Sequence, residues 1–208
     1  MAAPEDWLDL DAPAPLRAVL EEIGRCRICA GCLPHDPRPV LRLHPGARVM
    51  ICGQAPGRRV HDTGIPFNDP SGDRLRDWLG VDRRVFYDPG RFAILPMGFC
   101  FPGQDGRGAD LPPRRECAPA WRSRLAPWSA DVGLTLLVGQ YAQAWYLGRL
   151  RRRSMTETVR HWRDYLPAYL PLPHPSWRNT AWLRRHPWFE AEVLPELRRR
   201  VGILLEAP

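Results

Sequence analysis

The segment RVMICGQAPG at residues 48–57 decides the fold. A short apolar run, typical of a buried strand, is followed by two glycines and a proline that break the extended backbone. A second apolar run, residues 169–172, is followed in the same way by HPSWRN at residues 174–179. Open α/β sheets bind their ligands at the carboxyl ends of the strands, where such loops lie. The two loops therefore predict the active site of an enzyme that binds a flat polar ring.

Strand-like and helix-like segments alternate along the chain. The expected strands are residues 47–53, 91–98, 134–138 and 169–173, and the expected helices are residues 15–24, 71–79, 113–125, 140–147 and 187–205. This alternation predicts the α/β class: a three-layer α/β/α sandwich around a central, mostly parallel four-stranded sheet. No internal repeat or linker divides the chain, so we expect a flexible N-terminus over residues 1–13 and a single domain over residues 14–208.

The composition favours a polyanionic partner. The chain has 208 residues and a net charge of +7, and all 30 of its basic residues are arginine. A GC-rich genome explains arginine in place of lysine, but it does not explain the surplus of basic over acidic residues. A basic domain of this size is typical of nucleic-acid binding. Because the chain has no long apolar run and no basic-then-apolar leader, we expect a cytoplasmic protein with no membrane partner.

Cysteine spacing suggests a metal site. Reduced thiols in the cytoplasm act as ligands, buried residues or reactive groups rather than as disulfides. Cys26 and Cys29 form a CxxC pair, and Cys32 extends it into a second, overlapping pair. Cys100 and Cys117 follow much later in the chain. Four thiolates from two distant segments could hold zinc or an iron–sulfur cluster, and unligated buried cysteines are the alternative.

Taken in order, these motifs resemble a known family. The succession of a strand, a GxxPG loop, a GxPF segment, a helix and a terminal HPS is similar to that of the uracil-DNA glycosylase superfamily. The cysteine spacing is most similar to that of its iron–sulfur branch, family 4. The residues in register are Cys26, Cys29, Gly53, Pro56, Gly57, Gly64, Pro66, Phe67, Gly72, Cys100, Cys117, His174 and Pro175. The resemblance implies a 4Fe–4S cluster on Cys26, Cys29, Cys100 and Cys117, with Cys29 and Cys32 as an alternative pair.

The resemblance also implies what the two loops do. Enzymes of this family flip a damaged nucleotide out of the duplex and hydrolyse the N-glycosidic bond of its base. Phe67 is expected to stack on the flipped base, and the loop backbone, with Gly53 and Ala55, to bind it. Ordinary core packing is the alternative for Phe67. His174 is expected to stabilise the negative charge of the departing base, and a loop-capping hydrogen bond is its alternative role.

Residues after His174 are expected to contact DNA. In the family, the loop that follows HPS enters the minor groove, and here Ser176, Trp177 and Arg178 occupy it. An apolar wedge fills the gap that a flipped base leaves. Packing of Trp177 against the terminal helix is the alternative. Within the basic run at 149–153, Arg151 and Arg152 are candidate phosphate contacts, as is the pair at 184–185, although such runs also occur as solvated faces.

Two positions depart from the family pattern. The family has an acid after the first glycine of the loop, where this chain has Gln54, and an amide cannot act as a base towards water. The candidates to replace that acid are His61, Asp62 and Asp69. The asparagine with which the family reads the base is replaced by Pro96. The side chains of Asn68 and Asn179, or the backbone groups of Met97 and Gly98, are the candidates to read the base instead.

The sequence thus predicts a monofunctional uracil-DNA glycosylase that initiates base excision repair. Its partner is DNA that contains uracil or a related deaminated base, and we expect a monomer. The alternatives are a non-catalytic relative that binds damaged DNA, which Gln54 and Pro96 favour, and a hydrolase of free nucleosides.

Overall fold

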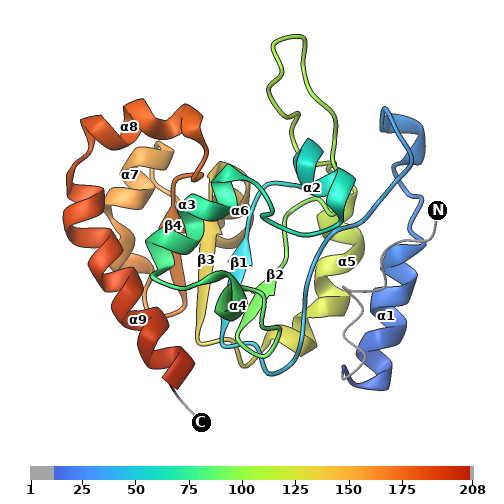
Figure 1. Ribbon diagram of the computed structural model, residues 1–208, viewed down its shortest axis with the longest axis horizontal. Helices are drawn as coiled ribbons and strands as arrows, with labels where there is room; N and C mark the ends of the chain where they lie inside the picture. The colour runs from blue at the N-terminus through green and yellow to red at the C-terminus, as the bar shows by residue number, and fades with distance from the viewer. Residues whose placement is uncertain (1–11, 207–208) are drawn as a thin grey trace.

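A parallel sheet of four short strands forms the centre of the molecule (Figure 1). The strands are β1 (Val49–Cys52), β2 (Phe92–Ile94), β3 (Leu134–Val138) and β4 (Tyr169–Leu172), in the spatial order β2-β1-β3-β4. Each neighbouring pair is parallel. The computed structural model describes residues 12–206, so residues 1–11 of the expected flexible N-terminus lie outside the described part.

Helices cover both faces of this sheet. Their bounds are α1 (Ala14–Gly24), α2 (Arg58–Thr63), α3 (Pro70–Leu79), α4 (Arg83–Phe86), α5 (Cys117–Leu125), α6 (Gln140–Leu147), α7 (Met155–Arg160), α8 (Thr180–Arg185) and α9 (Leu194–Glu206), with a π-helical turn at Phe189–Val193 and 3₁₀ turns at Ala30–Cys32, Ala126–Ser129, Gly148–Leu150, Trp162–Tyr165 and Trp177–Asn179. Met50 and Leu137 pack with α1, α5 and α6, whereas Ile51 and Leu136 pack on the opposite face with α3 and α9. Neighbouring residues face opposite layers because side chains alternate along a strand. The predicted α/β sandwich is confirmed.

Proline explains two differences from the expected element bounds. The strand expected over 91–98 ends at Ile94, and Pro96 cannot donate to a sheet ladder. The terminal helix expected over 187–205 begins with the π-helical turn, and α9 follows with Pro195 near its start. Because Pro195 has no N–H for a regular helical bond, an α-helix cannot run through it undisturbed. The short helices α2, α4, α7 and α8 were not expected.

The strand order places a binding crevice at the carboxyl edge of the sheet. From β1 the chain moves to β2 on one side and then crosses to β3 on the other, which makes a topological switch point at β1. Loops diverge at such a point and leave room for a ligand. Gly53 follows β1, and His174 follows β4 at the same edge. Within residues 12–206, none of the helices combines the length and apolar character needed to cross a bilayer.

Candidate active site

A pocket of about 350 Å³ lies at the carboxyl edge of the sheet, where the two motif loops meet. Most of its lining comes from four segments: the loop after β1, the segment that leads into α3, the segment after β4, and the long loop between β2 and α5. The lining residues are Val40, Gly53, Gln54, Ala55, Pro56, Gly57, Val60, Pro66, Phe67, Asp69, Pro70, Ser71, Ile94, Pro96, Gln104, Gly108, Asp110, His174, Ser176, Trp177 and Arg178. The structure therefore brings GQAPG and HPSWRN together in one pocket.

The GQAPG loop is fastened to the turn that follows β2. The N–H of Met97 donates to the carbonyl of Gly53 (2.9 Å), and the N–H of Gly98 donates to the carbonyl of Gln54 (3.0 Å). These two N–H groups, which are candidates to read the base, are therefore already bonded within the protein. Neither Met97 nor Gly98 lines the pocket, whereas Pro96 does.

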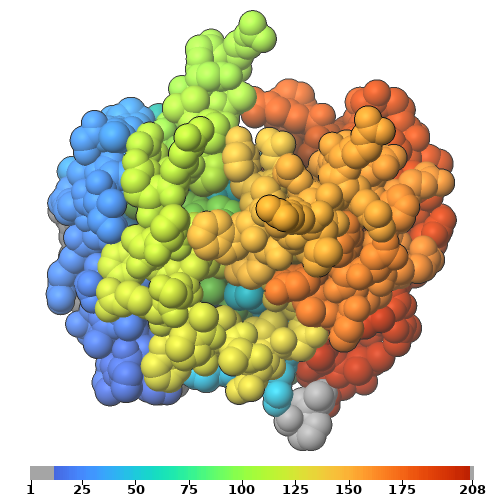
Figure 2. Space-filling view, turned by 180° about the vertical axis from the view of Figure 1, so that it is seen from behind, coloured from blue at the N-terminus to red at the C-terminus, as the bar shows by residue number. Residues whose placement is uncertain are grey.

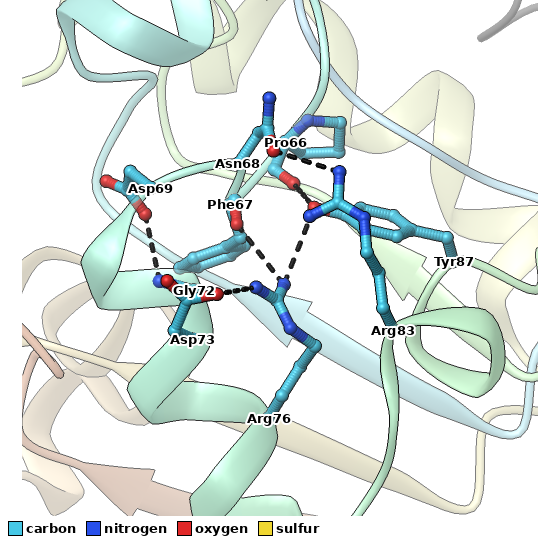
Figure 3. Close-up of polar contacts among 9 residues, drawn as sticks. All are labelled: Pro66, Phe67, Asn68, Asp69, Gly72, Asp73, Arg76, Arg83 and Tyr87. Carbon is cyan, nitrogen blue, oxygen red and sulfur yellow. Dashed lines mark hydrogen bonds and ion pairs between the residues drawn. The ribbon is translucent and has the colours of Figure 1, made fainter.

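Phe67 lines the pocket with a backbone in the left-handed region. Its φ is +53°, a conformation that costs a bulky residue roughly 1–3 kcal/mol. Figure 3 shows how this conformation is held: Arg76 Nη1 donates to the carbonyl of Phe67 (3.3 Å), and the Tyr87 hydroxyl donates to the carbonyl of Pro66 (2.8 Å). The ring of Phe67 reaches across to the GQAPG loop, because a Cβ on Gly53 would lie 3.5 Å from its Cζ. The backbone that carries the ring expected to stack on a base is therefore held in place.

The start of α3 fits against Phe67 only because residue 72 is glycine. A Cβ at Gly72 would lie 1.8 Å from the carbonyl oxygen of Phe67, far inside van der Waals contact. The N–H of Gly72 donates to Asp69 Oδ1 (2.8 Å), which makes Asp69 the N-cap of the helix (Figure 3). Asp69 also lines the pocket. One of the residues predicted to replace the missing acid is thus present in the pocket.

The surroundings of His174 favour a neutral ring and one of its two tautomers. The N–H of Ser176 donates to its Nδ1 (3.2 Å), so the proton of the neutral ring lies on Nε2. Burial lowers the pKa of His174 below its ordinary value, opposed by the nearby carboxylates of Asp69 and Asp110. Asn179 supports the same loop, because its Nδ2 donates to the carbonyl of His174 (2.7 Å). A neutral imidazole with a proton on Nε2 can donate a hydrogen bond to an oxygen that gains negative charge.

Trp177 and Arg178 form the outer part of the pocket. Trp177 is 71% exposed, so its ring is not buried against the terminal helix, which is the alternative to a DNA contact. The guanidinium of Arg178 lies 5.4 Å from the centre of the Trp177 ring, and its Nη2 donates to the carbonyl of Gly108 (2.9 Å). An exposed indole beside a cation suits insertion into a DNA groove.

Other predicted site residues lie outside the pocket lining. His61 packs against His35, with ring centres 4.0 Å apart, and Asp62 is exposed. Asn68 Oδ1 accepts from Arg83 Nη2 (2.9 Å). The candidate phosphate contacts are also elsewhere, Arg151 on the exposed surface and Arg152 in an ion pair with Asp164.

Asp110 is a pocket residue that sequence reasoning missed. It lies on the loop between β2 and α5, whose tip projects from the carboxyl edge of the sheet (Figure 1) and stands clear of the surface when seen from behind (Figure 2). The available signal was weak: a carboxylate in a glycine-rich loop, PGQDGRGADLPP at 102–113, that follows a strand. Because Asp110 is far from both motifs in the sequence, the sequence does not indicate that it lies beside them in the folded protein.

Four cysteines surround a second, small apolar cavity. Its lining residues are Ile23, Cys26, Ile28, Cys29, Pro39, Phe99, Cys100, Cys117 and Trp121. Burial raises the pKa of Cys100 to about 12 and that of Cys117 to about 11, so without a cation both thiols stay neutral at pH 7. Cys32 is exposed and does not line this cavity. Among residues 12–206, no three His, Cys, Asp or Glu side chains converge closely enough to bind a single metal ion.

Replacement of Gly72 by alanine should destabilise the protein. The added methyl overlaps the Phe67 carbonyl, and forced overpacking costs roughly 1–3 kcal/mol in the free energy of unfolding. Urea denaturation of Gly72→Ala measures this loss. Gly202→Ala is the matched control, because Gly202 is also helical and has open space around it. The control should be neutral or more stable, and equal stability of both variants would contradict the steric explanation.

The stability of the protein should fall in mild acid. The folded pKa of His174 lies below the unfolded value of about 6.5, so below that pH the unfolded chain binds more protons and is favoured. His61 contributes in the same direction, since burial lowers its pKa too. Between pH 7.5 and 5.5, His174→Gln should lose less unfolding free energy than the wild type. Replacement of the exposed His161 serves as the control, and parallel losses in wild type and His174→Gln would refute the prediction.

One comparison with known proteins bears on this site. The family model of the uracil DNA glycosylase superfamily matches residues 42–198, a span that includes both motif loops and the whole sheet. Members of this superfamily are glycosylase hydrolases that act on DNA. The matched span begins after Cys26 and Cys29, and it does not distinguish the iron–sulfur branch from the others. Because most of the sequence matches, the chain belongs to the uracil DNA glycosylase superfamily.

Proposed function

We propose that this protein is a monofunctional DNA glycosylase that removes uracil, or a related deaminated base, from DNA and so initiates base excision repair. The observation that carries the proposal is the combination of an aromatic ring on a held backbone, Phe67, and a neutral hydrogen-bond donor, His174, in one pocket of a glycosylase fold. Each group supplies something that removal of a base requires.

Phe67 supplies the stacking that a flipped base loses. A base leaves the duplex at a cost of a few kcal/mol, and stacking on an aromatic side chain returns roughly 1–3 kcal/mol. The network of Arg76 and Tyr87 holds the backbone of Phe67 before DNA arrives. The base therefore does not have to order its own stacking partner.

His174 supplies electrostatic stabilisation to the leaving group. As the C1′–N bond breaks, its electron pair stays on the base, and a carbonyl oxygen of the ring gains negative charge. The Nε2–H of His174 can donate to that oxygen, and a neutral donor needs no proton transfer in this step. Trp177 and Arg178 lie at the outer part of the pocket. The indole can fill the gap that the flipped base leaves in the duplex, and the guanidinium can bind an adjacent phosphate.

Among the residues that the structure describes, the pocket lining contains no side-chain amide placed to select uracil over other deaminated bases. Pro96 lines the pocket in the position of the family asparagine, so no side-chain amide there can pair with the adjacent N3–H and O4 of a uracil ring. The other base readers considered, Asn68 and Asn179, are bonded to Arg83 and to the backbone of His174. Hypoxanthine and xanthine are therefore included among the candidate bases.

For the cofactor, a 4Fe–4S cluster on Cys26, Cys29, Cys100 and Cys117 forms part of the proposal. The four thiols line one apolar cavity, and the burial that raises the pKa of Cys100 and Cys117 suits a group whose iron ions ionise the thiols that bind them. When bound, such a cluster supplies a covalent cross-link between the N-terminal turn, the turn after β2 and the first residue of α5. No residue of this cavity lines the proposed active site.

The wild-type protein should release base from a uracil-containing oligonucleotide and leave an abasic site. His174→Ala should slow single-turnover release by roughly 100- to 1,000-fold, the usual effect of losing one such donor. Alkaline cleavage of the product strand measures release from uracil, hypoxanthine and xanthine substrates. His161→Ala, in which an exposed histidine is removed, should match the wild type. Tight binding of uracil-containing DNA without release of any base would instead establish the non-catalytic alternative.

Cys117→Ser should lose both iron and stability. Protein purified without oxygen should contain iron and inorganic sulfide in the wild type and in Cys32→Ser, whose cysteine is exposed and outside the cavity. Cys117→Ser should contain little of either and melt at a lower temperature. A wild type without iron would refute the cofactor proposal. Loss of iron in Cys32→Ser with retention in Cys26→Ser would favour Cys29 and Cys32 as the ligand pair.

A further inference from the structure

Hydrolysis of a glycosidic bond needs an acceptor for the proton of the attacking water, and position 54 does not supply one. Gln54 lines the pocket, but its Nε2 donates to the carbonyl of Leu111 (2.9 Å), and an amide is not a base. His174 is also unsuitable, because its Nδ1 already accepts from Ser176 and its Nε2 carries the proton. The acceptor must therefore come from another lining residue.

Two carboxylates line the pocket within the described part of the chain, Asp69 and Asp110. Asp69 has a structural task, since its Oδ1 caps α3 by accepting from Gly72. Asp110 lies close to the GQAPG loop: a Cβ on Gly57 would lie 3.3 Å from its Oδ2. Its Oδ1 accepts from Gln104 Nε2 (3.1 Å), so the carboxylate is oriented with one oxygen towards the loop that carries the acid in the family.

The loop that carries Asp110 is held at its base. Gln104 and Asp110 form an antiparallel bridge, and the N–H of Leu111 donates to the carbonyl of Gly103 (2.9 Å). Gln54 holds the next residue, Leu111, through its side-chain amide. At the other side, Arg178 donates to the carbonyl of Gly108. Gln54, which occupies the position of the family acid, thus holds the loop that carries Asp110.

We propose that Asp110 is the catalytic carboxylate that accepts the proton of the attacking water, and that Gln54 is the positioning residue that holds it. This inference rests on the proposed glycosylase function. The C1′–N bond breaks and its electron pair leaves with the base as an anion. The water oxygen forms a bond to C1′, and its proton passes to Asp110. Solvent protonates the released base, and the strand keeps an abasic sugar with a hydroxyl group at C1′.

Asp110→Asn tests the catalytic role with little change of shape. Asparagine keeps an oxygen that can accept from Gln104 and loses only the negative charge. With the enzyme saturating, the single-turnover rate of base release should fall by roughly 100-fold or more, as for loss of a general base. Binding of uracil-containing DNA should persist, and the melting temperature should not change. Asp110→Glu should recover part of the rate.

Two matched variants complete the experiment. Asp131→Asn removes an exposed carboxylate that is not part of the pocket, and its rate should equal that of the wild type. Asp69→Asn keeps an N-cap, since asparagine caps helices well, and its rate should fall much less than that of Asp110→Asn. A loss of less than tenfold in Asp110→Asn, a larger loss in Asp69→Asn, or a loss explained by weaker DNA binding would each overturn the inference.

Gln54 is tested through its coupling to Asp110. Gln54→Ala should slow release in the wild type but add no further loss in the Asp110→Asn background, because it acts through that carboxylate. Additive losses would mean that Gln54 has a separate role. Failure of the wild type to release any base overturns the proposed function together with this inference. Normal release by both wild type and Asp110→Asn overturns the inference alone.

Discussion

The parallel hydrogen bonding of β1 with its two neighbours is the constraint on which the rest of the structure depends. It aligns the carboxyl ends of strands that are far apart in the sequence, so the segments after β1, β2 and β4 meet at one edge. Because helices cover both faces of this parallel sheet, most of the strand residues are apolar. Polar chemistry is thereby confined largely to the loops, and the pocket forms where several of them converge.

Several arginine side chains hold these loops by donating hydrogen bonds to their backbone carbonyls. Arg76 and Arg122 are both buried and donate to backbone carbonyls of turns at the pocket, those of Phe67 and of Leu95 and Pro96. Arg38 donates to the carbonyls of two consecutive residues in α2. A guanidinium offers five donors in a fixed plane, which suits carbonyl groups that a turn leaves unpaired. Part of the basic composition that favours a nucleic-acid partner therefore serves the interior of the protein.

The sequence predicted the sheet well and the site in part, for a physical reason. Short, mainly apolar runs bounded by glycine and proline, such as 134–138, coincide with strands because burial on both faces favours apolar side chains. His174 and Phe67 were predicted from their motifs, and the structure places both in the pocket lining. Asp110 could not be predicted, since its position depends on tertiary contacts of its loop with Gln54 and Arg178 rather than on local pattern. The short helix α2, and the packing of its His61 against Phe101 instead of in the pocket, could not be predicted for the same reason.

Helix α5 serves two parts of the molecule at once. Its first residue, Cys117, belongs to the cysteine-lined cavity, and little more than one turn later Arg122 binds the carbonyls of Leu95 and Pro96 beneath the pocket. The same guanidinium donates to the hydroxyl of Tyr146 in α6 (2.7 Å). Because an α-helix is stiff over so short a span, the distance between these two ends is fixed. The cysteine-lined cavity and the turn at Pro96 are therefore connected through the rigid helix α5. A substitution that shifts this helix at one site is expected to shift it at the other.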